Sequence, residues 1–330
     1  MLPVPAPTAT QVAVGGPRPP RLYPFAAQLK RPPPPAREES YGWLASVDSA
    51  RTRRWITVEN HFGERELRAI PQRAWIERRL EHLARAPAAR GAGEFTTERI
   101  LYLTATGKRL PMLIAYRRDL VRDGDRPAIL TVLRPRHGGS TPTLEPRARV
   151  WMELGGVYAE AQVPGEAQFE EAPRGVATLS VRSEALRDLI AAARYLFERG
   201  YTRRGRLAIY GRGYGGLLAG ALLTEFPRDF AVALPTGSWA EYRHPEPSVC
   251  YPPTLIATAR HDGIVRPWRG YELAAALQSV QACSSQPVLI RIYDQPIEPR
   301  AAASARIEGD ADALAFAARW LGVPAPPKAR

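Results

Sequence analysis

A glycine turn between a buried strand and an apolar helix is the most constraining feature of this sequence. Leu207 to Tyr210 is a short apolar run typical of a buried strand, and the chain reads as an apolar helix from Leu217. The turn Gly211-Arg-Gly-Tyr-Gly-Gly216 lies between them. Turns of this kind carry chemistry in two classes of protein, those that bind dinucleotides and those that raise a nucleophile above a sheet.

Strands and helices alternate on both sides of this turn. A β-hairpin is expected around 106–109, and the remaining strands are expected near residues 127–133, 157–162, 206–210, 230–235, 253–258 and 287–292. Helices are expected near residues 184–199, 217–226, 268–281 and 310–321. This alternation predicts an α/β fold with a doubly wound, mostly parallel sheet that helices cover on both faces.

The chain before the hairpin has a different character. Residues 1–40 are rich in proline and are expected to form an extended arm, whose order the sequence leaves open. Residues 41–94 read as two helices separated near Pro71 and followed by a linker of small residues, and residues 95–330 form the α/β domain. So short a helical segment cannot bury Trp55 and Trp75 alone, so it is expected to pack near the domain's C-terminal helix.

Composition narrows the classes of partner. The net charge is +13, but the arginines that supply it are scattered along the chain, so no nucleic-acid partner is expected. No stretch approaches the ~20 apolar residues of a membrane span, and the N-terminus lacks the pattern of a secretory signal. Cys250 and Cys283 are in no metal-binding spacing, so reduced structural thiols, no metal and a cytoplasmic location are expected.

The dinucleotide interpretation of the turn lacks its second requirement. Gly211, Gly213 and Gly216 fit the G-x-G-x-x-G pattern, but the mechanism also needs a carboxylate after the next strand to hold the ribose. The strand at 230–235 is followed instead by Thr236-Gly-Ser238. The turn also falls late in the expected sheet, so no cofactor is expected.

The nucleophile-elbow interpretation fits better. Gly211 and Gly215 flank the central position of the turn, where a G-x-S-x-G elbow holds its nucleophile. In such proteins an acid follows a later strand, and Asp262 follows the strand at 253–258. An inert role for Asp262, holding the turn before Gly263, stays open.

Several separate motifs resemble the prolyl oligopeptidase family of serine peptidases. They occur in the family's order: Tyr41-Gly-Trp-Leu44, Gly107-Lys-Arg-Leu-Pro-Met112, Arg187 through Thr202, Tyr210 through Leu218, and Tyr251 through Asp262. The resemblance implies an α/β-hydrolase fold, an N-terminal helical arm, and a Ser-His-Asp catalytic triad.

The chain departs from the family's pattern at the catalytic positions. The nucleophile position is Gly213, and the loop expected to carry the catalytic histidine has none, Pro299 being its approximate position. The oxyanion-side tyrosine of the family is replaced by His137, and Tyr214 follows the apex of the turn. Only Asp262 remains of the triad. The family's β-propeller is also missing, and the linker around 86–94 takes its place.

These departures predict a pseudoenzyme that acts as a binding or structural protein, with a possible protein or peptide partner at an open cleft. The alternative is an esterase or peptidase that uses a displaced nucleophile in the same cleft, with Ser238, Tyr214 or His137 taking part. A relic without a selected function is a third reading. The oligomeric state stays open. A strained elbow also predicts a positive φ at Gly213.

Overall fold

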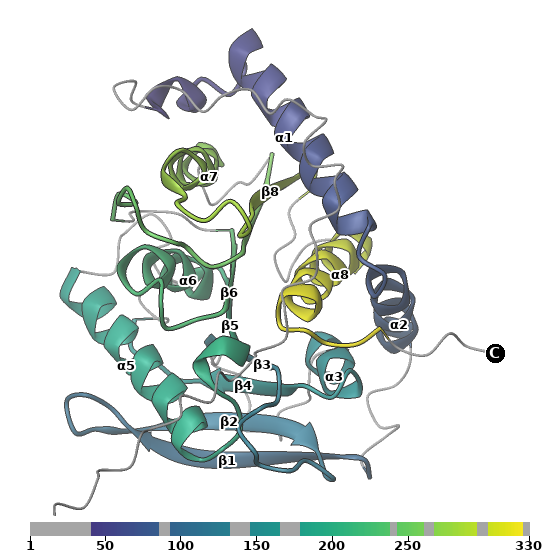
Figure 1. The fold of residues 1–330 in the computed structure, drawn as a ribbon, viewed down its shortest axis with the longest axis vertical. Helices are drawn as coiled ribbons and strands as arrows, with labels where there is room; N and C mark the ends of the chain where they lie inside the picture. The colour runs from purple at the N-terminus through teal and green to yellow at the C-terminus, as the bar shows by residue number, and fades with distance from the viewer. Residues whose placement is uncertain are drawn as a thin grey trace, which may run out of the picture.

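The computed structural model describes residues 41–85, 93–132, 146–165, 179–237, 243–260, 267–295 and 303–325. Its centre is an eight-stranded sheet in the order β1-β2-β4-β3-β5-β6-β7-β8 (Figure 1). The strands are β1 (Phe95–Leu103), β2 (Arg109–Arg117), β3 (Ala128–Val132), β4 (Val157–Ala161), β5 (Leu207–Arg212), β6 (Val232–Thr236), β7 (Thr254–Ala259) and β8 (Val288–Tyr293). The pairs β1–β2 and β2–β4 are antiparallel, and the others are parallel.

Helices lie on both faces of the sheet (Figure 1). One face carries α5 (Leu179–Glu198), α6 (Tyr214–Glu225) and α7 (Trp268–Val280), and the other carries α3 (Pro146–Glu153) and α8 (Ala303–Trp320). The N-terminal elements are η2 (Tyr41–Ala45), α1 (Ala50–Arg68) and α2 (Arg73–Arg85), and a short 3-10 turn, η3 (Arg204–Arg206), precedes β5. The expected doubly wound, mostly parallel α/β sheet is therefore confirmed.

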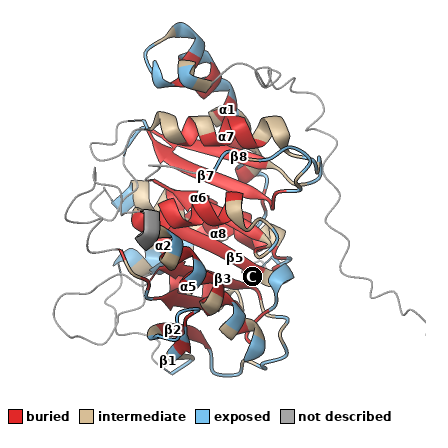
Figure 2. Ribbon diagram, turned by 90° about the vertical axis from the view of Figure 1, so that its left-hand side faces the viewer, coloured by how far each residue is buried: buried red, intermediate tan, exposed pale blue. Residues whose placement is uncertain are grey.

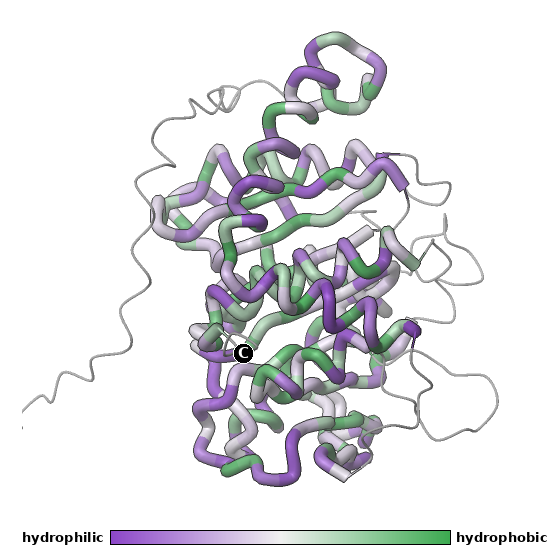
Figure 3. Tube along the Cα trace, turned by 90° about the vertical axis from the view of Figure 1, so that its right-hand side faces the viewer, coloured by the Kyte–Doolittle hydropathy of each residue, from purple (hydrophilic) through white to green (hydrophobic). Residues whose placement is uncertain are grey.

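Burial follows from this layering. Every residue of β3, β4, β6, β7 and β8 is buried, as Figure 2 shows for the central strands, because helices cover both faces there. The edge strand β1 instead alternates between covered and exposed positions. Figure 3 shows the matching concentration of hydrophobic residues along the central strands. Continuous apolar runs in the sequence were thus a sound signal for strands.

The helix α3 was not predicted from the sequence. It has only eight residues and contributes Val150, Trp151 and Met152 to the core. So short a segment shows barely two turns of helical periodicity, which is too little to distinguish it from a loop. Its residue Arg147 nevertheless contributes to the site described below.

The N-terminal helices share the hydrophobic core of the sheet. Trp55 of α1 packs against Tyr271 of α7, with 5.8 Å between the ring centroids. Ile76 and Leu80 of α2 belong to the core cluster that includes Phe316 of α8. Packing near the C-terminal helix, expected from the sequence, is confirmed.

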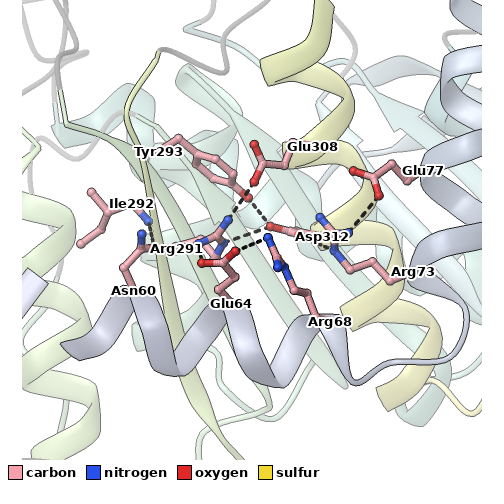
Figure 4. Close-up of polar contacts among 10 residues, drawn as sticks. All are labelled: Asn60, Glu64, Arg68, Arg73, Glu77, Arg291, Ile292, Tyr293, Glu308 and Asp312. Atoms are coloured by element: carbon pink, nitrogen blue, oxygen red, sulfur yellow. Dashed lines mark hydrogen bonds and ion pairs between the residues drawn. The ribbon is translucent and has the colours of Figure 1, made fainter. Parts of the chain in front are cut away.

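A buried polar network joins these helices to the last strand and helix (Figure 4). Asp312 of α8 is 1% exposed and accepts hydrogen bonds from Arg73 Nε at 2.6 Å, Arg291 Nε at 3.1 Å and the Tyr293 hydroxyl at 2.8 Å. Burial, with Asp312 nearby, raises the pKa of Tyr293 well above its usual value, so the phenol stays protonated and donates. One carboxylate therefore connects α2, β8 and α8.

Asn60 extends this network to α1. Its Oδ1 accepts from Arg291 Nη1 at 2.9 Å and from the backbone N–H of Ile292 at 2.9 Å. Glu308 accepts from Arg291 Nη2 at 2.9 Å, and burial raises the pKa of this carboxyl group. We call the set Asn60, Arg73, Arg291, Tyr293, Glu308 and Asp312 the junction network.

The expectation of reduced cysteines was wrong. Cys250 and Cys283 form a disulfide, with 5.1 Å between their Cα atoms. Cys250 precedes β7 and Cys283 precedes β8, so the parallel pairing of these strands brings both residues to one edge of the sheet. Their separation of 33 residues hid this proximity in the sequence. The cytoplasmic location stays a prediction. Because disulfides are rare in the cytosol, the redox state of this pair in the cell can test it.

The described helices do not resemble membrane-spanning segments. Within the described ranges, none of them combines the length and the apolar character that a bilayer crossing requires.

Candidate functional site

Gly213 lies at the apex of the turn between β5 and α6. Its backbone angles are φ 55° and ψ −124°, so the positive φ expected from the sequence is confirmed. Glycine adopts this conformation at little cost because it has no Cβ. A larger residue in this conformation would carry strain of about 1–3 kcal/mol. A nucleophile elbow imposes the same kind of strained conformation on its nucleophile.

Close backbone contacts fix the neighbouring glycines. A Cβ at Gly211 would overlap the carbonyl group of Gly215, and a Cβ at Gly216 would overlap the carbonyl oxygen of Thr236 on β6. These contacts are made by backbone atoms, so a side chain could be accommodated only by moving a strand or the helix. The spacing of these glycines therefore preserves the shape of the turn whether or not any reaction occurs there.

Tyr214, the residue after the apex, is fixed in the core. Its side chain is 3% exposed, and its hydroxyl donates a hydrogen bond to the carbonyl oxygen of Pro164 at 2.8 Å. Pro164 lies three residues beyond the end of β4, so this bond ties the turn to the segment after that strand. The Tyr214 hydroxyl thus has a structural partner and is shielded from solvent.

A second polar cluster supports the turn from the α8 side. Arg212 Nη2 lies 2.8 Å from Asp310 Oδ1, and Arg147 Nη1 lies 3.6 Å from the same oxygen. Arg147 Nε also donates to the Tyr158 hydroxyl at 2.8 Å, and its Nη1 donates to the Tyr210 hydroxyl at 3.3 Å. These contacts join α3, the end of β5 and α8 beside the turn.

Sequence reasoning missed this cluster for a topological reason. Arg147 belongs to the unpredicted α3, and Asp310 is on the final helix, 98 residues from Arg212. No local spacing connects the three residues. A signal that could have indicated them is the unusual placement of Arg212 at the end of an otherwise apolar strand.

The other predicted site residues, His137, Asp262 and Pro299, lie outside the described residues. They follow β3, β7 and β8, which run parallel to β5 and therefore end at the same edge of the sheet as Gly213. The topology thus brings the starts of their segments to the edge that carries the turn. Their geometry relative to Gly213 stays a prediction.

The described turn offers no side chain for nucleophilic attack. Gly213 has none, and the hydroxyls of Tyr210 and Tyr214 are buried and hydrogen-bonded to other groups. In the part of the chain that the structure describes, there is also no group of three His, Cys, Asp or Glu side chains placed to hold a metal ion. What the described arrangement provides is a rigid turn whose central position is unoccupied by a side chain.

Comparison with known proteins shows what this arrangement is similar to. The model of the prolyl oligopeptidase family matches residues 142–244, which include the turn. A prolyl endopeptidase of Elizabethkingia miricola is 30% identical over 269 residues, covering 69% of this chain and 37% of the relative. The dipeptidyl aminopeptidase BI of Pseudoxanthomonas mexicana is 29% identical over 148 residues, covering 43% and 20%. The chain thus spans little more than a third of the length of the curated prolyl endopeptidases it matches.

Solved structures agree with the fold. A structure from a study of two prolyl endopeptidases has a TM-score of 0.56 and 28% identity, and the match covers 70% of this chain and 39% of that one. Prolyl oligopeptidase B from Galerina marginata, without ligand, has a TM-score of 0.58 and 22% identity, with coverages of 70% and 37%. The second likeness supports the fold alone. The chain is therefore similar to prolyl oligopeptidases in sequence around the turn, and its fold is that of an α/β-hydrolase.

Proposed function

We propose that this chain is a catalytically inactive prolyl oligopeptidase homologue that acts as a binding or structural protein. The observation that carries the proposal is Gly213, which has the backbone conformation of an elbow and no side chain to form an acyl-enzyme. An elbow that retains its shape but lacks its nucleophile can present a surface, but it cannot attack a carbonyl.

The missing histidine supports the same proposal. The chain has five histidines, and none lies beyond His261, so the segment after β8 offers no histidine to act as the general base. In serine peptidases the serine and the histidine act as one unit, and loss of either lowers turnover about 10⁶-fold. Loss of both leaves no more than the ~10³–10⁴-fold contribution of the oxyanion hole and substrate binding.

A displaced nucleophile is the alternative, and the described residues give it no support. Tyr214 would need a base within hydrogen-bond distance, but its hydroxyl faces the carbonyl oxygen of Pro164. Ser238 and His137 lie outside the described residues.

The partner we propose is a protein or peptide at the carboxyl edge of the sheet. Residues 86–94 alone join α2 to β1, so no propeller is inserted between the N-terminal helices and the sheet. Without an inserted domain at that point, a ligand larger than a short peptide could approach Gly213 from this edge.

The proposal is tested by labelling the full chain with a fluorophosphonate probe and by measuring hydrolysis of p-nitrophenyl esters. We expect no labelling and no saturable turnover. An active serine peptidase serves as the positive control. Saturable hydrolysis by the wild type that the fluorophosphonate abolishes would refute the inactive assignment and favour a displaced serine.

Two variants test the reason for inactivity. Gly213→Ser is expected to lower the free energy of unfolding by about 1–3 kcal/mol, because serine is strained at this φ, without creating turnover. The double variant Gly213→Ser with Pro299→His is expected to regain weak esterase activity if Asp262 points toward the turn. Comparable esterase activity in the single variant would show that the chain supplies another base.

A further inference from the structure

A pocket lies at the sheet edge opposite to Gly213. It is bounded by the second half of α1, by the segment between α7 and β8, and by the end of α8, and its volume is about 290 Å³. Pro287 and Val288 line it, so it opens at the amino end of β8, whereas Gly213 follows the carboxyl end of the parallel strand β5. The pocket is therefore separate from the elbow.

Aromatic side chains form its apolar walls. Phe62 of α1 faces it from one side, and Phe316 and Trp320 of α8 face it from another, with 6.2 Å between the centroids of the latter two rings. Phe316 is fully buried, while Phe62 and Trp320 are half-buried, so the rings lead from the core to the mouth. Such walls favour an apolar or aromatic ligand body.

The third wall is held rigidly by Gln281. Its Oε1 accepts from the backbone N–H groups of Tyr251 at 3.0 Å and Cys283 at 3.2 Å. Its Nε2 donates to the carbonyl oxygens of Tyr251 at 3.0 Å and Gln286 at 3.1 Å. The Cys250–Cys283 disulfide ties the same two segments together. A wall fixed in this way is largely preformed, so a ligand would lose little free energy in ordering it.

The charges at the pocket do not balance. Two charged side chains line it, Glu66 and Arg319. Glu66 is neutralised by Arg65 at 3.1 Å, whereas Arg319 has neither an ion pair nor a side-chain hydrogen bond within the described ranges. The uncompensated charge at the pocket is therefore positive and half-buried, a setting in which a guanidinium group pairs well with a carboxylate.

We propose that this pocket binds a small carboxylate with an aromatic or branched apolar body. The carboxylate pairs with Arg319, and the body lies against Phe62, Phe316 and Trp320. A cavity of about 150 Å³ holds benzene, so this pocket suits a ligand of roughly twice that size. The net charge of +13 adds a general attraction for anions.

Calorimetric titration of the full chain with 4-phenylbutyrate tests the proposal, with the uncharged 4-phenylbutyramide as the matched ligand. Saturable binding of one equivalent is expected for the acid, with at least tenfold weaker binding of the amide. Absence of saturation at millimolar acid, or equal affinity for acid and amide, would overturn the proposal.

Two variants locate the site. Arg319→Gln is expected to weaken binding of the acid at least tenfold and to leave the amide unchanged. Arg78→Gln removes an equal charge from an exposed position on α2 and is expected to change neither affinity. Thermal melting of each variant verifies folding. Unchanged affinity in Arg319→Gln, or an equal loss in both variants, would contradict the assignment of Arg319. Neither result depends on whether the elbow is inactive.

Discussion

The elbow and the junction network differ in what their residues contribute to the structure. At the elbow, Gly213 and Gly216 provide backbone shape and no functional group. At the junction network, Arg291 and Asp312 provide buried charge, and their role is to join α1 and α2 to β8 and α8. Buried ionisable groups are often taken as signs of an active site, but here they mark an attachment.

This difference explains why neither region is expected to catalyse hydrolysis. A reaction needs a nucleophile within reach of a base, and neither described region supplies both. The elbow has the backbone conformation of a nucleophile elbow but no nucleophilic side chain. The junction network has ionisable side chains, but Asp312 accepts hydrogen bonds from three partners and is almost completely shielded from solvent. Single substitutions should therefore affect stability strongly at the junction network and should create catalytic activity in neither region.

The largest effect is expected from Asp312→Ala. It removes the most deeply buried of the carboxylates around Arg291 and an acceptor from Arg73, so the free energy of unfolding should fall by about 3–5 kcal/mol. Urea denaturation measures this loss. The matched control is Glu77→Gln, which removes the more exposed partner of Arg73 and should cost less than about 1 kcal/mol. Equal effects of the two variants would show that burial of the pair does not matter.

A second buried carboxylate differs from Asp312 because it has no hydrogen-bond partner among the described residues. Asp188 of α5 is 1% exposed, and neither of its carboxylate oxygens has a hydrogen-bond partner in the described structure. Burial, with a smaller effect of Glu184, raises its pKa to about 6. An unfolded aspartate has a pKa of about 3.9, so the folded protein binds the extra proton between these values. Stability should therefore fall as pH rises from about 4 to about 6.

Asp188→Asn should remove this dependence. At pH 7 the variant should be more stable than the wild type by about 2–3 kcal/mol, since about 1.4 kcal/mol corresponds to each pKa unit. Denaturation midpoints from pH 4 to pH 8 provide the measurement. Asp125→Asn, at an exposed ion pair with Arg203, is the control and should change stability by less than about 1 kcal/mol. A wild-type profile that rises between pH 4 and pH 6, with no gain in the variant, would contradict the unpaired state.

The smallest of these effects is expected at the elbow. Gly216→Ala forces a Cβ against the carbonyl oxygen of Thr236, so α6 or β6 must shift, at a cost of about 1–3 kcal/mol. Gly93→Ala is the control, because no described atom beyond the adjacent residues lies within 4 Å of the added methyl group. Thermal denaturation compares the two. A Gly216→Ala variant as stable as the control would mean that the turn tolerates movement.

Local patterns in the sequence were sufficient to predict most of the fold. The central strands are mostly apolar runs, and the glycine turn marks the passage from β5 to α6, so the order of elements followed directly. The helix α3 was missed because its eight residues are too few for periodicity. The disulfide was missed because only the parallel pairing of β7 and β8 brings Cys250 to Cys283.

The candidate site was predictable only in part. The conformation of Gly213 followed from its place in the turn, because glycine spacing reflects backbone geometry. The supporting contact between Arg212 and Asp310 did not follow, since it joins residues 98 positions apart. The roles of His137, Asp262 and Pro299 depend on loops outside the described residues and remain predictions.

The bond from Asn60 to Ile292 has a consequence for synthesis of the chain. The two residues are 232 positions apart, so α1 leaves the ribosome long before its partner strand exists. At about 5–20 residues per second, this interval is roughly 10–50 s. During that time Trp55 and Ile56, which are buried in the finished protein, have no β8 or α7 to cover them. A nascent chain of this topology should therefore depend on chaperones that shield its first helices until translation is nearly complete.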